Sequence, residues 1–341
     1  MANIAIVNFC NLKCKYCFAD DMIQEKPKVI TIEDYRYILS FLSRTPKNHV
    51  GIIGGEPTLH PKFEEILKET NKYCMKVNTG ATLFTNAIEL ERFLPFIGDR
   101  IGLLINVNSP EYQSAEATKK LTETLDHLYE LAWFDKKANC GCNIHPDCKD
   151  YSFIWNIVDK YHLNHIRCSV VSPAATYEKY RSDKEGYYNM MKPMFLSFAE
   201  EAIKHNCRLN MDCGHIPMCY FNMEEKAMLE SICHNLYQDW CEPVVDITPD
   251  FKATACFGSY DPVDIRDFNT LFELERYLQI NKSLPKVKAN CTGKCTVCKQ
   301  YELMQCQGGC LGFADAVPNT IDKHTCDGNC GGECNGDCKC H

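Results

Sequence analysis

The chain has 341 residues, of which 24 are cysteines, and its formal net charge at pH 7 is −8. Lysine and arginine are scattered, which argues against a nucleic-acid partner because such a partner needs a basic face or stripe. No apolar run approaches the roughly 18 residues of a membrane span, and the N-terminus lacks the features of a secretory signal. We therefore expect no membrane partner and a cytoplasmic protein, in which dense cysteine indicates metal binding or catalysis rather than disulfides.

Short β-branched runs alternate with longer amphipathic runs through the first two thirds of the chain. The alternation predicts strands at residues 4–7, 50–53, 81–86, 101–107, 137–144, 165–171 and 208–211. It predicts helices at 31–43, which Thr31 would cap, and at 61–73, 115–131, 153–161 and 187–204. Strands that alternate with helices in this way indicate an α/β fold with a mainly parallel sheet, either a barrel or an open sheet.

Three cysteines follow the first predicted strand, namely Cys10, Cys14 and Cys17. A four-iron cluster normally takes four cysteine ligands, so three leave one iron free to bind a substrate or cofactor. An open coordination position is what separates catalytic metal sites from closed structural ones. The segment 54–57, Gly-Gly-Glu-Pro, follows the second predicted strand. Both segments therefore fall at carboxyl ends of strands, where functional residues of such folds gather.

Together these segments resemble the radical S-adenosylmethionine (SAM) superfamily, whose pattern is C-x3-C-x-aromatic-C followed by a GGE-type segment. The resemblance implies an α/β fold with a partial (β/α)6 barrel over residues 1–215. It implies a [4Fe-4S] cluster held by Cys10, Cys14 and Cys17, whose fourth iron chelates SAM. Reduction by an electron donor such as flavodoxin or ferredoxin would cleave SAM, and the resulting 5′-deoxyadenosyl radical would take hydrogen from the substrate.

The same resemblance implies a set of residues that contact SAM. Adjacent glycines would let the backbone approach its methionine end, and Glu56 would accept a hydrogen bond from the ammonium. For Asn86 and Asn106 an alternative is open, that they are strand-end asparagines that satisfy turns. The expected cofactor-binding residues are Tyr16, Gly54, Gly55, Glu56, Pro57, Asn86 and Asn106.

From about residue 240 the helical periodicity fades, and a short hairpin is predicted from 244–247 and 253–255. Seven cysteines here have the spacing C-x14-C, then C-x2-C-x7-C-x3-C, then C. They resemble the SPASM domain, a small module that follows radical SAM domains in peptide-modifying enzymes. It would span residues 241–326, after a connecting helical segment at 216–240. The seven cysteines are Cys241, Cys256, Cys295, Cys298, Cys306, Cys310 and Cys326.

The SPASM resemblance implies two auxiliary [4Fe-4S] clusters. The first would be held by Cys241, Cys256 and Cys310, with Cys291 as a candidate fourth ligand. The second would be held by Cys295, Cys298, Cys306 and Cys326. Zinc is an alternative, since paired C-x2-C and C-x3-C units also suit tetrahedral zinc. Cys213 and Cys219, near the end of the expected barrel, are candidates to face the substrate.

The tail at residues 327–341 consists almost entirely of Cys, Gly, Asp, Asn, Lys and Glu. Starting from Cys326, cysteines recur every four residues at 330, 334 and 338. This period resembles the CXXX-repeat peptides that are substrates of one group of radical SAM/SPASM maturases. The alternative is a metal-chelating or disordered tail, because such a composition cannot bury an apolar core.

We therefore predict an enzyme, a radical SAM peptide maturase that forms a thioether in a cysteine-rich ribosomal precursor peptide. One alternative is a dehydrogenase or epimerase of the same superfamily that acts on a peptide or protein. Sulfatase maturases have this layout, but Phe257 stands where they carry a carboxylate, which disfavours formylglycine formation. The other alternative is a non-catalytic iron–sulfur or metal-binding protein. That alternative predicts no SAM binding and so gives the Gly-Gly-Glu-Pro segment no role.

Overall fold

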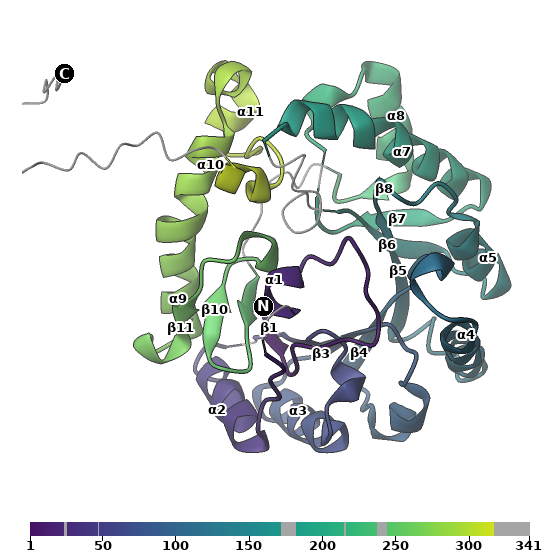
Figure 1. Cartoon of the computed structure of the whole chain (residues 1–341), viewed down its shortest axis with the longest axis vertical. Coiled ribbons are helices and arrows are strands. Elements are labelled where there is room, and N and C mark those ends of the chain that lie inside the picture. The colour runs from purple at the N-terminus through teal and green to yellow at the C-terminus, as the bar shows by residue number, and fades with distance from the viewer. Residues whose placement is uncertain (24–25, 47, 172–181, 215, 237–243, 317–341) are drawn as a thin grey trace, which may run out of the picture.

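One continuous sheet organises the molecule. The computed structural model describes residues 1–23, 26–46, 48–171, 182–214, 216–236 and 244–316 (Figure 1). In these residues, eleven strands form a sheet with the order β11-β10-β9-β1-β2-β3-β4-β5-β6-β7-β8. The predicted ligands Cys241 and Cys326, and the predicted tail 327–341, lie outside the described residues.

Eight of these strands run parallel in chain order, as the alternation of the sequence predicts. The parallel order continues past six strands through a seventh and a two-residue eighth, so the run is longer than the predicted (β/α)6 unit. Apolar side chains on these strands are buried, which is typical of parallel sheets covered by helices. The strands are β1 (Ala2–Ala5), β2 (Val50–Ile53), β3 (Ala81–Thr85), β4 (Ile101–Asn106), β5 (Ala138–Ile144), β6 (His165–Val170), β7 (Arg208–Met211) and β8 (Cys233–His234).

The helices that alternate with these strands lie on the outer side of the curved sheet (Figure 1). Thr31 caps its helix as predicted, because its hydroxyl oxygen accepts a hydrogen bond from the Asp34 amide at 3.0 Å. The predicted helix at 61–73 begins at Phe63 instead, since Pro61 lies in the preceding turn. These outer helices are α2 (Ile32–Leu42), α3 (Phe63–Val77), α4 (Ala115–Glu130), α5 (Ser152–Lys160), α7 (Lys184–Lys204) and α8 (Met223–Ile232). The short helix α1 (Asp20–Ile23) lies on the inner side, beside the N-terminus.

The predicted hairpin exists, and it extends the barrel sheet. Strands β9 (Val245–Ile247) and β10 (Lys252–Thr254) pair antiparallel, and β11 (Val263–Asp264) pairs with β10. Strand β9 also pairs parallel with β1, with Ala2 opposite Val245. The apolar residues of this region belong to the same buried core as the barrel. The described residues after 244 are thus joined to the barrel by both sheet and core.

The remaining described segment is helical and lies beside the hairpin (Figure 1). It contains α9 (Leu271–Leu278), a π-helical turn (Gln279–Ser283), α10 (Leu284–Asn290) and α11 (Lys299–Glu302). A 3₁₀ turn at Gly293–Val297 separates α10 from α11 and carries Cys295. Among the described helices, we find none with the length and apolar character that crossing a membrane would require.

Candidate active site

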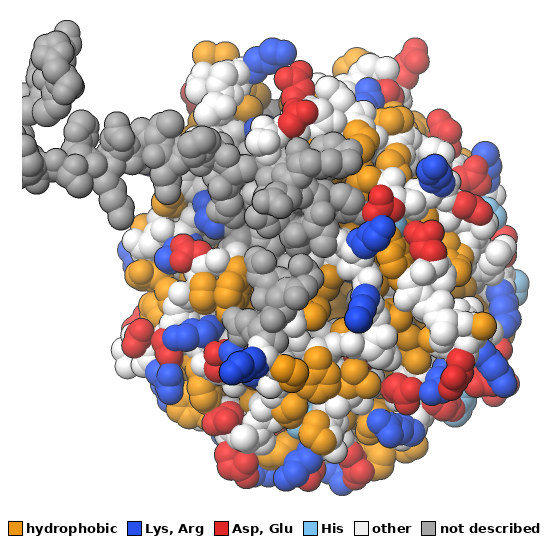
Figure 2. Space-filling model, viewed as in Figure 1, with side chains coloured by type: hydrophobic (Ala, Val, Ile, Leu, Met, Phe, Trp, Pro, Cys, Tyr) orange, Lys and Arg blue, Asp and Glu red, His pale blue; other side chains and the backbone are white. Residues whose placement is uncertain are grey.

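A cavity of about 1490 Å³ lies at the carboxyl ends of the parallel strands. Its lining includes the strand-end residues Ile53, Thr85, Asn106 and Val170. This position is the one at which parallel α/β folds place their functional groups. On the face seen in Figure 2, acidic and basic side chains are intermixed, so this face carries no basic stripe that would suit a nucleic acid.

The three N-terminal cysteines line this cavity together. Cys10, Cys14 and Cys17 are each partly buried in the loop that follows β1. The amide of Cys17 donates to the carbonyl of Cys14 at 3.1 Å, which closes a tight turn between them. The Leu12 amide lies 3.4 Å from the Cys10 sulfur, where it favours the thiolate. The sequence prediction that these residues act as one group is consistent with this arrangement.

The surroundings of Cys10 and Cys14 favour the neutral, protonated thiol over the thiolate when no metal is bound. Burial, helped by the nearby charges of Glu56 and Cys17 and opposed by hydrogen bonds from backbone amides, raises the pKa of Cys10 to about 12. Burial likewise raises the pKa of Cys14 to about 11. Among the described residues, no three His, Cys, Asp or Glu side chains have a metal-binding arrangement. Iron would supply the positive charge that thiolates need at this depth.

The Gly-Gly-Glu-Pro turn packs directly against the start of the cysteine loop. The amide of Gly55 donates to Val7 O at 3.0 Å, and the amide of Glu56 donates to Phe9 O at 2.9 Å. A β-carbon at Gly55 would lie 2.1 Å from Phe9 O, and one at Gly54 would lie 2.6 Å from Val7 O. The glycines are therefore needed for contact between two backbone segments of the protein itself, and not only for an approach to SAM.

The Glu56 carboxylate joins this turn to the end of β3. Its side chain is 1% exposed, and Oε1 accepts hydrogen bonds from the Thr58 amide, the Thr58 hydroxyl and the Thr85 hydroxyl at 2.7–3.1 Å. Oε2 accepts one from the Asn86 amide at 2.8 Å. Burial raises the pKa of Glu56, although these hydrogen bonds oppose the shift.

No positively charged side chain among the described residues forms an ion pair with Glu56. A buried charge without an opposite charge is costly. The ammonium group of SAM would offset this charge, so the residues present fit the cofactor.

The two predicted asparagines both line the cavity. Asn86 donates to the side-chain oxygen of Asn11 at 2.7 Å and accepts from the Ile88 amide at 3.1 Å. It therefore satisfies a turn, as the alternative interpretation predicts, and it also ties β3 to the cysteine loop. Asn106 ends β4, and its carbonyl accepts a hydrogen bond from the Asn108 side chain at 3.2 Å.

Asn108 is a site residue that the sequence analysis missed. Its side-chain oxygen accepts a hydrogen bond from the Tyr16 hydroxyl at 2.5 Å and lies 3.7 Å from the Cys14 sulfur. The Tyr16 ring is buried and packs against His145, with 4.3 Å between ring centroids. Tyr16 thus connects the cysteine loop to Asn108 and His145, and it also lines the cavity. The only sequence signal was the position of Asn108, two residues beyond the predicted Asn106.

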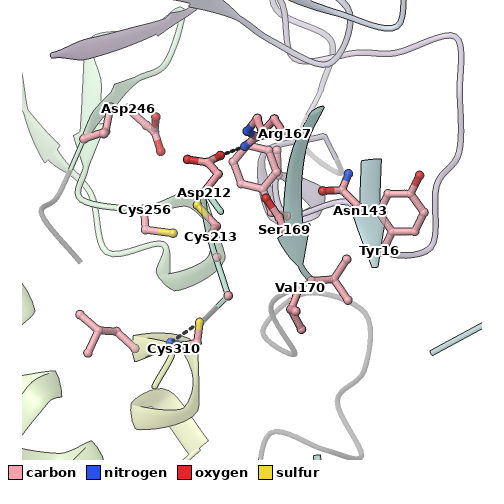
Figure 3. Close-up of a pocket in the computed structure, with 18 of the residues that line it drawn as sticks. Tyr16, Asn143, Arg167, Ser169, Val170, Asp212, Cys213, Asp246, Cys256 and Cys310 are labelled. Carbon is pink, nitrogen blue, oxygen red and sulfur yellow. Dashed lines mark hydrogen bonds and ion pairs between the residues drawn. The ribbon is translucent and has the colours of Figure 1, made fainter. Parts of the chain in front are cut away.

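An ion pair on the far wall was also missed. Arg167 on β6 pairs with Asp212, which follows β7, and both line the cavity (Figure 3). Burial lowers the pKa of the Arg167 guanidinium, and the neighbouring Cys213 opposes this shift. Strand register brings these residues together, since Arg167 lies opposite Asn210 in the β6–β7 pair. The predicted substrate-facing cysteines, Cys213 and Cys219, do line the cavity.

The cysteines of the C-terminal region divide into two locations. Cys256 and Cys310 line the cavity opposite the N-terminal cysteine loop (Figure 3). Cys291 is instead buried with Cys295 packed against it, and a β-carbon at Gly308 would lie 3.0 Å from the Cys291 sulfur. Cys291 does not line the cavity, and its role as a candidate fourth ligand of the first auxiliary set stays a prediction.

The sequence matches the model of the Radical SAM superfamily over residues 4–132. Residues 4–132 form a radical SAM domain. This domain is that of a radical SAM enzyme, and it covers part of the chain. A GTP 3′,8-cyclase from Synechocystis sp. is 32% identical over 106 residues, which cover 31% of this chain and 32% of that protein. The match therefore spans about a third of the length of that relative.

Solved structures that contain bound S-adenosylmethionine share the fold of a larger part of the chain. The structure of Streptococcus suis SuiB bound to S-adenosylmethionine aligns with a TM-score of 0.61 and 16% identity, over 91% of this chain and 72% of that one. SuiB has also been solved bound to its precursor peptide SuiA. The structure of anSMEcpe with bound AdoMet aligns with a TM-score of 0.61 and 17% identity, over 91% and 88% of the two chains. These likenesses establish the fold.

The close backbone contact at Gly55 predicts that Gly55→Ala destabilises the protein. Its β-carbon would overlap Phe9 O, and overpacking of this kind typically costs about 1–3 kcal/mol. The matched control is Gly102→Ala, whose β-carbon would come no closer than 3.4 Å to any neighbouring atom. Urea denaturation under reducing conditions measures both. Equal free energies of unfolding for the two variants would contradict the proposed backbone contact.

The buried Asp246 predicts a pH dependence of stability. Asp246 lines the cavity and accepts a hydrogen bond from Asn3 at 2.8 Å, and burial raises its pKa to about 7. An unfolded chain releases this proton near pH 4, so between about pH 4 and 7 the folded state binds more protons and its stability falls as pH rises. In that window the titration of Asp246 lowers the free energy of unfolding by about 1.4 kcal/mol for each pH unit of increase.

Asp246→Asn should remove this slope and be more stable than the parent at pH 8, with a smaller difference at pH 5. Thermal unfolding followed by circular dichroism at the two pH values measures the effect. Asp135→Asn, at an exposed position, is the control and should keep the parent slope. An Asp246→Asn variant with the same pH slope as the parent would show that Asp246 is ionised throughout.

Proposed function

We propose that the chain modifies a cysteine-rich peptide by radical SAM chemistry, with a thioether between a cysteine sulfur and a carbon atom as the product. The observation that supports this most is that one cavity is lined, among the described residues, both by the N-terminal cysteine loop and by Cys256 and Cys310. Its volume of about 1490 Å³ exceeds the roughly 300–1000 Å³ of ordinary small-molecule sites. It has room for a peptide segment beside SAM.

In this proposal Cys10, Cys14 and Cys17 hold the [4Fe-4S] cluster, and the turn at 54–57 with Asn86 and Asn106 binds SAM. Bound together, cluster and SAM supply one-electron cleavage and hydrogen-atom abstraction. The negative charge of Glu56 balances the positive charge of the methionine ammonium group. Hydrogen bonds from Thr58, Thr85 and Asn86 hold the buried carboxylate in position for this contact. A donor such as flavodoxin or ferredoxin would deliver the electron.

The chain itself keeps water from the reacting groups. Apolar side chains line the cavity near the cysteine loop, and exclusion of water protects a reactive radical from side reactions. Hydrogen bonding between Tyr16 and Asn108 holds the Cys14 side of the loop in place. Apolar residues that line the cavity in or next to this loop, or on the adjacent strands, include Leu12, Phe18, Ile53, Phe84 and Leu104.

The far end of the cavity supports a substrate that contains thiols. Cys256 and Cys310 would belong to the first of two auxiliary [4Fe-4S] clusters, and both line the cavity. A thiolate of the substrate could reach that cluster, which could take up the surplus electron of thioether formation. A peptide substrate is also supported by the shared fold, since SuiB binds its precursor peptide SuiA and anSMEcpe has been solved with a Cp18Cys peptide.

A nucleotide substrate is the second candidate, favoured by the similarity to GTP 3′,8-cyclase. Arg167, Lys282 and Lys286 line the cavity and could meet phosphate groups. The similarity, however, covers 106 residues, 31% of this chain. Because it leaves most of the chain unmatched, it supports a shared type of reaction more than a shared substrate.

The test compares a peptide with GTP as substrate. Anaerobically reconstituted protein is incubated with SAM, dithionite and a synthetic peptide of residues 326–341, in which cysteines recur every four residues. We expect 5′-deoxyadenosine and a peptide that has lost two hydrogens for each thioether. One hydrogen goes to the deoxyadenosyl radical, and the thiol proton leaves together with an electron taken by an auxiliary cluster. Mass spectrometry measures both products.

Two variants serve as controls in this assay. Cys14→Ala should give neither product above the enzyme-free level, since the cluster loses a ligand. Cys207→Ala should give both, because Cys207 is fully buried outside the cavity lining. If GTP is converted while the peptide keeps its mass, the nucleotide candidate replaces the peptide.

A further inference from the structure

The sheet is open between its two ends, β8 and β11, among the described strands. Helix α8 leads directly into β8, and the segment that contains α10 lies beside the hairpin on the other side of the opening (Figure 1). Both helices contribute residues to the cavity lining. Where the sheet is open, the cavity is therefore bordered by helices, and a peptide that approaches from this side passes between them.

One face of α8 lines the cavity, whereas its opposite face is packed. The lining residues have the spacing i, i+3, i+4 and i+7, which is one side of a helix. Leu229 and Ile232, on the other side, are buried. The ammonium of Lys226 forms no ion pair with the described residues, although Glu225 beside it pairs with Lys192. The lining residues of α8 are Met223, Lys226, Ala227 and Glu230.

The second helical wall carries two lysines one turn apart. Lys282 lies in the π-helical turn and Lys286 on α10, and both line the cavity. Single π-helical turns frequently occur at functional sites. Lys282 forms an ion pair with Asp261 at 2.8 Å, and Asp261 also lines the cavity. Val287, next to Lys286, is buried, so the helix that presents the lysines is anchored from behind.

The charges of the cavity are divided between helices and strands. Three of the four charged residues that α8, the π-helical turn and α10 place in the lining are lysines, and the fourth is Glu230. On or next to the strands, Glu56, Asp212 and Asp246 line the cavity with one cation, Arg167. The whole chain has a net charge of −8, so the lysines gather here against its composition. Cationic SAM suits the carboxylate-rich part, and an anionic group suits the lysines.

This arrangement suits separate carboxylates better than a chain of phosphates. Phosphate sites use the free amides of a helix N-terminus, but in α8 these are engaged by a capping box between Asn222 and Glu225, at 2.7 and 2.9 Å. Helix α10 continues the π-helical turn and has no open N-terminus. Glu230 and Asp261, which lie among the lysines, would repel the closely spaced charges of a triphosphate.

We propose that Lys226, Lys282 and Lys286 bind Asp and Glu side chains of the substrate, so that the preferred substrate is an acidic cysteine-rich peptide. The inference rests on the proposed function for a peptide as the substrate, and it adds the charge of the residues between the cysteines. Lysines on two facing helices each meet a different carboxylate of an extended chain. Met223, on the same face as Lys226 and 77% exposed, offers an adaptable apolar contact to the residues between them.

The peptide used above as a test substrate has the charge that this proposal requires. Residues 326–341 contain three acidic residues and one lysine, so their side chains carry a formal charge of −2 with His neutral. The acidic residues lie between the recurring cysteines, where each can extend away from a cysteine that reacts. They are Asp327, Glu333 and Asp337.

Binding of two peptides to the full reconstituted chain tests the proposal. The acidic peptide is residues 326–341 with blocked ends, and the matched amide peptide has Asn or Gln in place of its Asp and Glu. The protein carries the same three replacements in its own tail, so that the tail does not compete through its charge. Fluorescence anisotropy of the labelled peptides, under anaerobic reducing conditions, measures the Kd at low and high salt.

The acidic peptide should bind more tightly than the amide peptide, and an increase from about 50 to about 300 mM salt should reduce the difference. Lys226→Gln and Lys286→Gln should each weaken binding of the acidic peptide by about two- to fivefold, the range of one exposed ion pair. Neither change should affect the amide peptide. Lys76→Gln, at an exposed position in the last turn of α3, removes the same charge and should affect neither peptide.

Equal affinities of the two peptides overturn the proposal, and so does an equal loss in Lys76→Gln or a failure of the acidic peptide to bind. GTP that displaces the acidic peptide, and that itself binds more weakly to Lys226→Gln, would assign the lysines to a nucleotide instead. Binding requires neither SAM cleavage nor a reductant. An acidic peptide that binds and keeps its mass therefore counts against the proposed function alone, whereas an amide peptide modified with the same kcat/KM overturns this inference alone.

Discussion

The contact between the Gly-Gly-Glu-Pro turn and the backbone that leads into the cysteine loop is the constraint on which the rest of the site depends. Two amides of the turn donate to Val7 and Phe9, and the contact is so close that Gly55 has no room for a β-carbon. The buried Glu56 carboxylate then fastens the same turn to Thr85 and Asn86 at the end of β3. Three neighbouring strand ends are thereby fixed relative to one another before any cofactor binds.

This constraint also explains why SAM suits the site. A carboxylate that accepts four hydrogen bonds but no ion pair within the described residues keeps an uncompensated negative charge at the edge of the cavity. The cysteine thiols nearby become negative only when a metal stabilises them. A cationic cofactor next to an iron cluster satisfies both requirements. The chain thus prepares the position of the ligands, while the charge balance is completed by what binds.

Local patterns predicted the parts of the fold that local forces determine. The C-x3-C-x2-C loop, the Gly-Gly-Glu-Pro turn, the Thr31 cap and the strands of the parallel run follow from spacing and periodicity. Pairing of β9 with β1 joins residues more than 240 positions apart, and such a pairing leaves no mark in either segment. The Arg167–Asp212 pair likewise depends on the register of β6 and β7. The role of Cys291 as a candidate fourth ligand comes from a family pattern and stays a prediction.

The central claim is that the iron left without a protein thiolate at Cys10, Cys14 and Cys17 binds SAM. Electron–nuclear double resonance on the reduced protein tests this directly, with SAM labelled by ¹⁵N in the amino group and ¹⁷O in the carboxylate. The account predicts hyperfine coupling of both labels to the cluster, and loss of both couplings in Cys14→Ala. A reduced cluster whose spectrum shows neither coupling when SAM is saturating would contradict it.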